Sequence, residues 1–360
     1  MNLDQDAIFM AIAIKLAKKG CFTTDPNPNV GCVLVLNGAV VAKGWHVKAG
    51  RDHAEVNALK QVTNVKGATA YVTLEPCSHY GKTGPCCEAL IAAGVKRIVV
   101  AMQDPNPLVA GKGLKKMQEA GLIVECGILQ QDAEALNQGY IKRMTTGLPF
   151  VRSKLGMSLD GRTAMASGES QWITSPQSRM DVQSLRAESS VVLTGINTVL
   201  ADNPSLNVRL DVEVKQPIRV ILDSLLQVSL TAKMLTLAGE SWILTVSEDK
   251  QKIRRLEAVG FQVFQIKNNE NRLDLEVVMV FLGQKQINTV LVEAGAILNG
   301  ALLKQDLVDE WIVYMAPSIL GDQGRGLFHL PEMQTMDDKK QLKITNVRQI
   351  GPDLRLIFNS

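Results

Sequence analysis

One histidine, one glutamate and two cysteines in the first quarter of the chain are the residues best suited to chemistry. Glu55 lies two positions after His53, and Cys77 and Cys86 follow, each directly after a proline. An imidazole and two thiolates are ligands that zinc prefers, and three protein ligands leave a fourth position for water, as in catalytic zinc sites. The pattern therefore predicts a catalytic zinc centre held by His53, Cys77 and Cys86.

The elements expected around these residues favour the same interpretation. Helices are expected to start at about His53 and at Pro85-Cys86. Proline suits a first helical turn, so Cys86 would lie among unpaired backbone N–H groups that stabilise a thiolate. Residues two apart on a helix face different ways, so Glu55 is not expected to be a ligand. We expect it to act as a general acid and base beside the bound water.

Other uses of the cysteines are less favoured. Six cysteines in a long chain without an export signal indicate a reducing compartment, where disulfides are rare. Eight residues separate Cys77 from Cys86, unlike a C-x-x-C redox motif. A closed structural zinc site would need a fourth ligand, for which His79 and Cys87 are the nearby candidates. Otherwise the cysteines outside the centre are expected to be buried: Cys21, Cys32, Cys87 and Cys126.

Length and composition bound the class of protein. At 360 residues the chain exceeds the size at which one core keeps growing, so two domains are expected. The net charge of +3 is spread along the chain and aromatic residues make up only 4%, which disfavours a nucleic-acid partner and favours a small phosphorylated molecule. The sequence shows neither a signal peptide nor an apolar run that could span a bilayer, which favours a cytoplasmic protein without membrane contact.

Strands alternate with helices along both halves of the chain, which is typical of an α/β fold with largely parallel strands. Two strands flank Asn37-Gly38, a strong signal for a two-residue hairpin turn. Two threonines, a glycine and a proline within residues 145–149 interrupt the pattern, so we expect domains of residues 1–146 and 147–360. Near the end, segments 341–350 and 353–358 alternate apolar and polar residues, as an antiparallel edge hairpin should.

Residues near the predicted metal centre indicate which class of substrate it accepts. Asn27 lies in a turn fixed by two prolines, where its amide could hydrogen-bond to a pyrimidine edge. Lys82, between the two cysteines, is either a phosphate contact or a solvated loop lysine. With its H-x-E and two Pro-Cys pairs the site resembles the zinc-dependent cytidine and deoxycytidylate deaminases. In that chemistry zinc-activated water displaces ammonia from the ring and the glutamate carries the proton.

The motifs "GWHVKAGRDHAE", "EPCSHYGKTGPC" and "DPNP" at 104–107 resemble more specifically the deaminase half of the bifunctional riboflavin-biosynthesis deaminase/reductases. The resemblance covers most of residues 1–146 and implies a cytidine-deaminase-like three-layer α/β/α domain. It also implies that six residues line the substrate site: Asn27, His46, His79, Lys82, Asp104 and Asn106.

The second half resembles the same family independently. Segments such as "KLGMSLDGRTA", "TGINTVLADNPSLNVR" and "VEAGAILNGALL" occur in the order of the family's reductase domain, whose α/β fold is similar to dihydrofolate reductase. In the last segment a strand leads into a helix, and a helix start can hold a dinucleotide phosphate. By pattern alone Gly295 and Gly300 are more often loop and packing glycines. No G-x-G-x-x-G motif follows a strand, which disfavours a Rossmann site.

The resemblance implies two sets of contacts in the second half. The first set would touch NADPH: Gly156, Trp172, Thr198, Asp202, Ser224, Gly295, Ala296, Ile297, Leu298, Asn299, Gly300 and Ala301. The second set would hold the substrate: Lys154, Asp160, Ser170, Arg186, Leu206, Arg209 and Glu293. Within it, Arg186 and Arg209 suit a phosphate group by their forked donors. Lys154 and Asp160 are expected near the reacting ribose, although a strand-end ion pair is an alternative.

These expectations indicate a bifunctional enzyme of riboflavin biosynthesis that uses one zinc ion and NADPH. We expect residues 1–146 to deaminate 2,5-diamino-6-ribosylamino-4(3H)-pyrimidinone 5′-phosphate, and residues 147–360 to reduce the ribosyl group of the product to ribityl. One alternative keeps the zinc but takes a nucleic-acid base as substrate, with the second half as a binding platform. A homo-oligomer, with a dimer favoured, is expected, although neither the oligomeric state nor the preference for NADPH over NADH is settled by the sequence.

Overall fold

The computed structural model describes residues 3–80, 84–107, 109–266 and 272–359. The chain divides into two compact units, Met1–Gly147 and Leu148–Ser360. The interruption of the sequence pattern at residues 145–149 lies at their junction. Within the described residues, no helix combines the length and the apolar character needed to cross a bilayer.

A five-stranded sheet forms the centre of the first unit, in the order β2-β1-β3-β4-β5. β1 runs antiparallel to β2 and β3, whereas β3, β4 and β5 are parallel. Asn37 and Gly38 join β1 to β2 with φ values of 53° and 79°, so the predicted two-residue hairpin is confirmed. The strands are β1 (Gly31–Leu36), β2 (Ala39–Trp45), β3 (Thr69–Val72), β4 (Arg97–Val100) and β5 (Ile123–Cys126).

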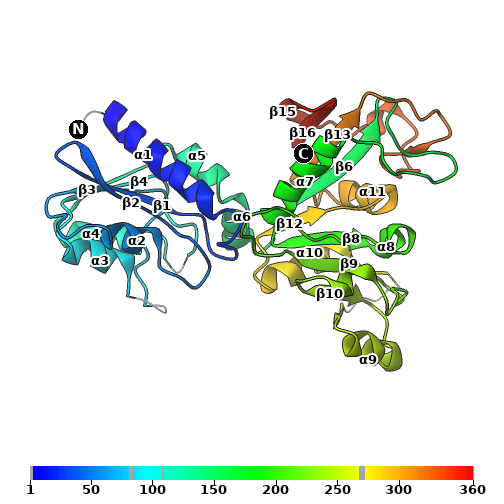
Figure 1. Ribbon diagram of the computed structural model, residues 1–360, viewed down its shortest axis with the longest axis horizontal. Helices are drawn as coiled ribbons and strands as arrows, with labels where there is room; N and C mark the ends of the chain where they lie inside the picture. Colours follow the sequence, from blue (N-terminus) through cyan, green and yellow to red (C-terminus); the bar gives the residue numbers. More distant parts are fainter. Residues whose placement is uncertain (1–2, 81–83, 108, 267–271, 360) are drawn as a thin grey trace. The chain divides into compact units, whose positions relative to one another are not determined.

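Helices cover both faces of this sheet, as Figure 1 shows. Cys32 and Leu34 of β1 pack against α2, α3 and α4, whereas Val33 and Val35 pack against α1, α5 and α6. This is the expected three-layer α/β/α arrangement, because alternate residues of a strand point to opposite faces. The helices are α1 (Leu3–Ala17), a 3₁₀ turn (Lys18–Gly20), α2 (Ala54–Leu59), α3 (Cys86–Ala92), α4 (Lys112–Glu119), α5 (Gln130–Ala135) and α6 (Gln138–Thr146).

A buried ion pair fastens α1 to the sheet. Both terminal nitrogens of Arg97 donate to the Asp6 carboxylate at 2.8 Å, and Tyr71 Oη donates to Asp6 Oδ1 at 2.6 Å. Arg97 also pairs with Glu125 at 2.8 Å. Asp6 is only 1% exposed, yet the hydrogen bonds from Arg97 hold the pKa of its carboxyl below the usual range.

The second unit is built on a nine-stranded sheet in the order β11-β10-β9-β8-β12-β6-β13-β16-β15. In this spatial order, all strands from β11 through β6 to β13 are parallel. β16 and β15 complete the sheet as an antiparallel hairpin at its edge, which confirms the edge hairpin predicted for the end of the chain. The strands are β6 (Phe150–Ser158), β8 (Val191–Gly195), β9 (Ile218–Leu222), β10 (Ser241–Thr245), β11 (Gln262–Gln265), β12 (Thr289–Val292), β13 (Glu310–Ala316), β15 (Lys343–Ile350) and β16 (Asp353–Asn359), and a separate pair is β7 (Arg162–Ala164) with β14 (Arg325–Gly326).

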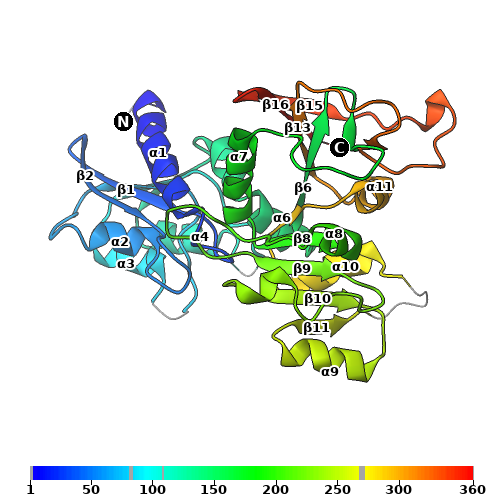
Figure 2. The same cartoon turned by 45° about the vertical axis from the view of Figure 1, so that its right-hand side comes forward.

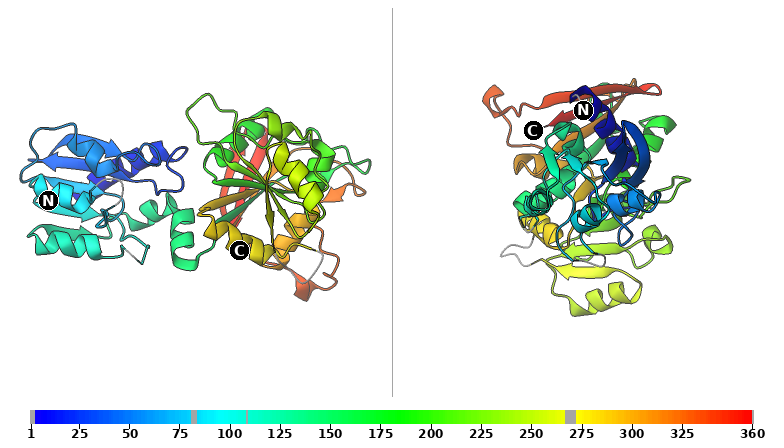
Figure 3. Two further views of the ribbon diagram at one scale, coloured as in Figure 1. Left: turned by 90° about the horizontal axis from the view of Figure 1, so that it is seen from below. Right: turned by 90° about the vertical axis from the view of Figure 1, so that its left-hand side faces the viewer.

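Helices lie on both faces of this second sheet, which Figures 2 and 3 show from different sides. Hydrophobic residues of α10 and α11 pack on one face, and those of α8 and α9 on the other. The helical segments are α7 (Pro176–Ala187), α8 (Ile196–Asp202), α9 (Lys250–Ala258), α10 (Leu275–Gln284), α11 (Ala296–Lys304) and two 3₁₀ turns (Lys233–Thr236 and Met336–Asp338). The sequence pattern does not predict α8, because its β-branched residues have low helix propensity.

Three local expectations are wrong. Pro85 is the residue that precedes α3 rather than part of its first turn. Cys126 is exposed and Cys21 is half-buried, whereas Cys32 and Cys87 are fully buried as expected. Cys126 ends the edge strand β5, where no further strand covers it.

Candidate functional site

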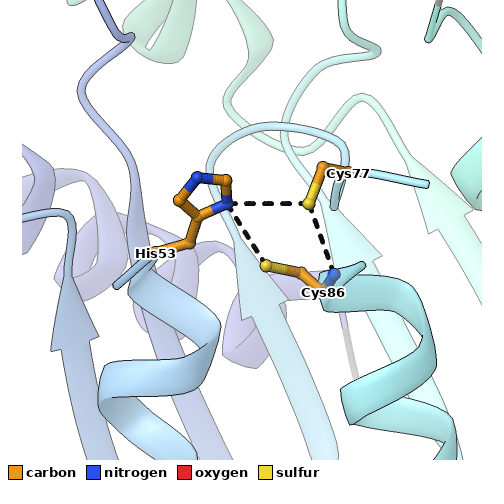
Figure 4. A group of neighbouring side chains, drawn as sticks. All are labelled: His53, Cys77 and Cys86. Carbon is orange, nitrogen blue, oxygen red and sulfur yellow. Dashed lines mark hydrogen bonds between the residues drawn. The ribbon is translucent and has the colours of Figure 1, made fainter. Parts of the chain in front are cut away.

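Three side chains from separate segments of the first unit converge on one point. His53 directly precedes α2, Cys77 follows β3, and Cys86 opens α3. His53 Nδ1 lies 3.6 Å from Cys77 Sγ and 3.3 Å from Cys86 Sγ, as Figure 4 shows. The ligand atoms of all three residues lie within 4.8 Å of one another.

These separations fit a zinc ion. Tetrahedral zinc at about 2.3 Å from sulfur and about 2.05 Å from nitrogen places the nitrogen and sulfur about 3.6 Å apart, close to the observed 3.6 and 3.3 Å. Among the described residues no further histidine, cysteine or carboxylate joins the group. The closed structural site, with His79 or Cys87 as fourth ligand, therefore finds no support in this geometry.

The protonation of the two thiols also calls for a cation. The Cys86 side chain and His53 hydrogen-bond to Cys77 and lower its pKa, whereas the adjacent Cys77 sulfur raises the pKa of Cys86. The backbone N–H of Cys86 also donates to Cys77 Sγ at 3.3 Å. Without a cation only one of the two sulfurs is favoured as a thiolate, whereas a divalent ion stabilises both.

Glu55 lies beside the centre without joining it. Its side chain is 3% exposed, and Oε2 has no hydrogen-bond partner among the described residues. Burial raises the pKa of Glu55 to about 7. A carboxyl group that titrates near neutrality can both take up and release a proton, and the orphaned oxygen leaves an acceptor for a substrate or water proton.

Asn27 and His46 meet on one side of the centre. Asn27 Nδ2 lies 3.1 Å from His46 Nε2, and His46 Nδ1 lies 3.0 Å from the Asp52 carbonyl oxygen. The carbonyl requires a donor, so His46 is protonated on Nδ1 and accepts from the Asn27 amide through Nε2. Burial lowers the pKa of His46, which favours this neutral form. The two rings of His46 and His53 stand edge to face, 5.5 Å apart.

Asp104, Asn106 and His79 belong to a second group of predicted residues. Asp104 Oδ1 accepts from the Asn106 backbone N–H at 2.9 Å and from Tyr140 Oη at 3.1 Å. Burial raises the pKa of Asp104, and the nearby His79 opposes this shift. His79 is exposed. Lys82, the remaining predicted residue, lies outside the described residues.

Sequence reasoning missed Glu75 and Tyr140. Glu75 is 3% exposed and accepts backbone N–H groups from the segment that contains Asp104. The one available signal was an acidic residue directly before Pro76-Cys77, shortly after a buried strand.

In the second unit, Lys154, Arg186 and Glu293 come together. Arg186 Nε and Nη2 donate to the Glu293 carboxylate at 2.5 and 3.0 Å, and Lys154 Nζ lies 3.3 Å from Glu293 Oε2. Burial alone would raise the pKa of Glu293, but Arg186 and Lys154 lower it to about 2. The third Arg186 nitrogen donates to the Asn207 carbonyl at 3.0 Å. The guanidinium expected to hold a substrate phosphate is therefore engaged by protein groups.

The other residues assigned to the reductase substrate occupy different environments. Arg209 is exposed and donates to Asn207 Oδ1 at 3.1 Å. Leu206 is buried with a φ of 51°, a conformation that non-glycine residues adopt rarely. Ser170 is half-buried. Asp160 accepts from the Leu320 and Gly321 backbone N–H groups. Lys154 forms the ion pair with Glu293, so the alternative of an ion pair is found at Lys154.

The residues of the run from Gly295 to Ala301 have different surroundings. A Cβ atom on Gly295 would meet nothing within 4 Å, whereas one on Gly300 would lie 2.2 Å from the His329 carbonyl oxygen. Asn299 is fully buried, accepts from Ser153 Oγ at 2.6 Å and donates to the Ala294 carbonyl at 2.8 Å. The Gly300 Cα and the Asn299 side chain are therefore packed against protein groups, and contact of the whole run with NADPH stays a prediction. Ala296 is also buried, while Ile297 is exposed and Leu298 and Ala301 are half-buried.

The remaining residues assigned to NADPH lie on several elements of the same unit. Gly156 is on β6, Thr198 and Asp202 are on α8, and Ser224 closely follows β9. Trp172 is 70% exposed, and the Arg179 guanidinium stacks 4.5 Å from its ring centre. Trp172 also lines a cavity of about 420 Å³ between the start of α7 and the end of β13, which none of the other predicted NADPH residues line.

The first unit thus has the fold and the open His-Cys-Cys centre of a zinc-dependent deaminase, and a dihydrofolate-reductase-like unit follows it. Family models agree with both parts. Residues 3–102 match the cytidine and deoxycytidylate deaminase zinc-binding region, and residues 149–356 match the RibD C-terminal domain.

Individual relatives align over nearly the whole chain. The riboflavin biosynthesis protein RibD of Escherichia coli strain K12 is 52% identical over 98% of both chains. Acinetobacter baumannii RibD has a solved structure with a TM-score of 0.93, at 46% identity and 99% coverage of both chains. The Thermotoga maritima diaminohydroxyphosphoribosylaminopyrimidine deaminase/5-amino-6-(5-phosphoribosylamino)uracil reductase has a TM-score of 0.87, at 32% identity and 99% coverage of both. The chain belongs to the RibD family of riboflavin biosynthesis proteins, with a deaminase domain and a reductase domain.

Proposed function

We propose that residues 1–146 deaminate 2,5-diamino-6-ribosylamino-4(3H)-pyrimidinone 5′-phosphate and that residues 147–360 reduce the ribosyl group of the product to ribityl with NADPH. The observation that carries the proposal is the His53-Cys77-Cys86 group with the buried, half-satisfied Glu55 carboxyl beside it. The name of the Thermotoga relative, which joins a deaminase and a reductase activity, supports the same pair of reactions.

In the deaminase, His53, Cys77 and Cys86 would hold zinc. Bound zinc supplies a Lewis acid that makes water nucleophilic near neutral pH. Glu55 Oε2 takes a proton and delivers it to the amino nitrogen, which leaves as ammonia. The Asn27 amide is held by the neutral His46 ring, so it is oriented before a pyrimidine arrives. Asp104 and Asn106 would bind the substrate from a second loop.

In the reductase, NADPH supplies a hydride, which would add at C1′ of the ring-opened ribosyl imine. The open space at Gly295, at the start of α11, suits a cofactor phosphate. Glu293 holds the Lys154 ammonium near the end of β12, where it can orient the ribose. Because Arg186 is engaged by Glu293, Arg209 is the better candidate for the substrate phosphate.

The experiment that tests both steps is incubation of the purified protein with the deamination substrate, with and without NADPH, followed by mass analysis. Without NADPH the expected product is the deaminated ribosyl compound together with ammonia, and with NADPH the ribityl compound. Recovery of unchanged substrate under both conditions would refute the proposal. Replacing NADPH by NADH in the same assay decides the cofactor preference.

The assembly is a further part of the proposal. A homo-oligomer, with a dimer favoured, stays a prediction that sedimentation of the purified protein can test. A monomer at assay concentration with full activity in both steps would contradict it.

A further inference from the structure

Glu75 has a role that the reaction itself does not assign. It lies between β3 and the zinc-ligand candidate Cys77, and its backbone N–H donates to the Met102 carbonyl at 3.0 Å. The side chain is 3% exposed. A buried carboxylate is costly unless hydrogen bonds satisfy it, so its partners show what it is for.

Four backbone N–H groups from one segment satisfy the Glu75 carboxylate. Oε2 accepts from Asp104 at 3.2 Å and from Gly111 at 2.9 Å. Oε1 accepts from Gly113 at 2.8 Å and from Leu114 at 3.3 Å. Each oxygen therefore takes two donors, and the carboxylate joins the start of the segment to its end at the first turn of α4.

Gly113, in the first turn of α4, packs directly against Glu75 and Pro76, the residues that precede the candidate ligand Cys77. A Cβ atom on Gly113 would lie 2.3 Å from the Pro76 carbonyl oxygen and 3.1 Å from Glu75 Oε1. No side chain fits between the two segments, so a small displacement of either one moves the other. The position of residues 104–107, here called the substrate loop, is thus tied to the residues that precede Cys77.

A second set of hydrogen bonds, from α6 near the C-terminal end of the first unit, holds the same substrate loop. Tyr140 on α6 donates to Asp104 Oδ1 at 3.1 Å, and the Asn106 backbone N–H donates to the same oxygen at 2.9 Å. Glu75 fixes the Asp104 backbone while Tyr140 fixes its carboxylate. Asp104 is 8% exposed, so little solvent competes with these bonds.

We infer that Glu75 is a positioning residue for deamination, which sets the substrate loop at a fixed distance from the His53-Cys77-Cys86 centre. It does not touch the reacting atoms, because its four acceptor sites are occupied by backbone donors. The inference rests on the proposed function, in which Asp104 and Asn106 bind the pyrimidine substrate.

The test is Glu75→Gln in the full-length protein, with ammonia release measured against substrate concentration. The glutamine carbonyl can still accept two N–H groups, but its NH₂ group confronts the other two, which displaces the loop. Displacement of a binding loop by about 1 Å weakens substrate positioning, so KM should rise about tenfold while kcat changes less than about threefold. Zinc content, and reduction of separately supplied deaminated product by NADPH, should match the parent protein.

Glu119→Gln is the matched control, because Glu119 on α4 is exposed and pairs with Lys115 at 3.8 Å. It should leave KM and kcat unchanged. Tyr140→Phe is the second variant, which removes a single hydroxyl and should raise KM about threefold without loss of zinc. An unchanged KM in Glu75→Gln, or a fall in activity that follows loss of zinc, would overturn the inference. If Glu75→Gln fails to fold, a parental KM in Tyr140→Phe overturns it instead.

The parent protein separates this inference from the function on which it rests. A parent that releases no ammonia refutes the proposed deaminase. If the parent releases ammonia and Glu75→Gln has the same KM as the parent, the proposed deaminase stands and only the positioning role of Glu75 is refuted.

Discussion

At the scale of single residues, two features of the candidate metal centre indicate missing partners: the pair of neighbouring thiols and the buried Glu55 carboxyl. The sulfurs of Cys77 and Cys86 favour a nearby cation, because each thiolate disfavours the other: the pKa of Cys77 is lowered while that of Cys86 is raised. Glu55 needs a proton partner because one carboxylate oxygen is buried without one. A divalent ion would stabilise both thiolates, and a proton from water or substrate would satisfy the Glu55 oxygen.

Glu55→Gln should abolish deamination selectively. The amide keeps the shape of the side chain but cannot carry a proton, so kcat for ammonia release should fall by about 10² to 10⁴. Zinc content and NADPH-dependent reduction of supplied product should stay at parental levels, since Glu55 is not in the ligand group. Ammonia release at the parental rate would show that another group moves the proton.

At the scale of secondary-structure elements, polar side chains fix how helices meet the sheets. Asp6 and Arg97 tie α1 to β4 across the first core. In the second unit, Asn299 ties α11 to β6 through Ser153. Each bond joins residues far apart in the sequence, so its loss should loosen one element rather than the whole unit.

The ion pair between Asp6 and Arg97 should make the free energy of unfolding depend on pH. The folded-state pKa of Asp6 is lowered, so its contribution is complete above the ordinary carboxyl pKa of about 3.9 and is lost as the pH falls through the lower folded value. Asp6→Asn should cost about 1–3 kcal/mol of unfolding free energy at pH 7. Urea unfolding at a series of pH values should show the parent converging on the variant below about pH 4. A constant difference down to pH 2 would contradict this linkage.

Two glycines near the start of α11 should respond differently to alanine. Gly300→Ala places a methyl group against the His329 backbone, so we expect a loss of stability of about 1–3 kcal/mol, measured by urea unfolding. Gly295→Ala meets no protein atom, so the fold should lose less than about 1 kcal/mol while KM for NADPH rises. A Gly295→Ala protein with a parental KM for NADPH would remove this helix start from the cofactor site.

At the scale of the whole molecule, the two units have separate sheets and separate hydrophobic clusters. The candidate metal ligands His53, Cys77 and Cys86 all belong to the first unit. Metal binding stabilises the state that binds it, so its effects should stay within that unit.

Removal of zinc by a chelator should therefore separate the two activities. Ammonia release should stop, and NADPH-dependent reduction of supplied product should continue. In calorimetry the transition of the first unit should shift to lower temperature while the second transition stays in place. Re-addition of zinc should restore ammonia release, and equal loss of both activities would contradict the separation.

Much of the fold follows from local pattern. The Asn37-Gly38 turn, the helix at residues 176–187 and the final edge hairpin need only backbone preferences and alternation, which act over a few residues. The short helix α8 and the exposed Cys126 do not follow, because neighbours in space override propensity and decide which edge stays uncovered.

The sequence by itself determined the candidate metal centre, since His53, Cys77, Cys86 and the neighbouring Glu55 can be recognised from residue type and spacing. Only the tertiary structure decided which side chains remain available. Arg186 forms an ion pair with Glu293. The Asn299 side chain and the Gly300 Cα pack against protein groups. The Glu75 carboxylate accepts four backbone N–H groups that are distant in the sequence. The physical reason is that a side chain's free donors, acceptors and space depend on partners brought near by folding, and no local pattern records them.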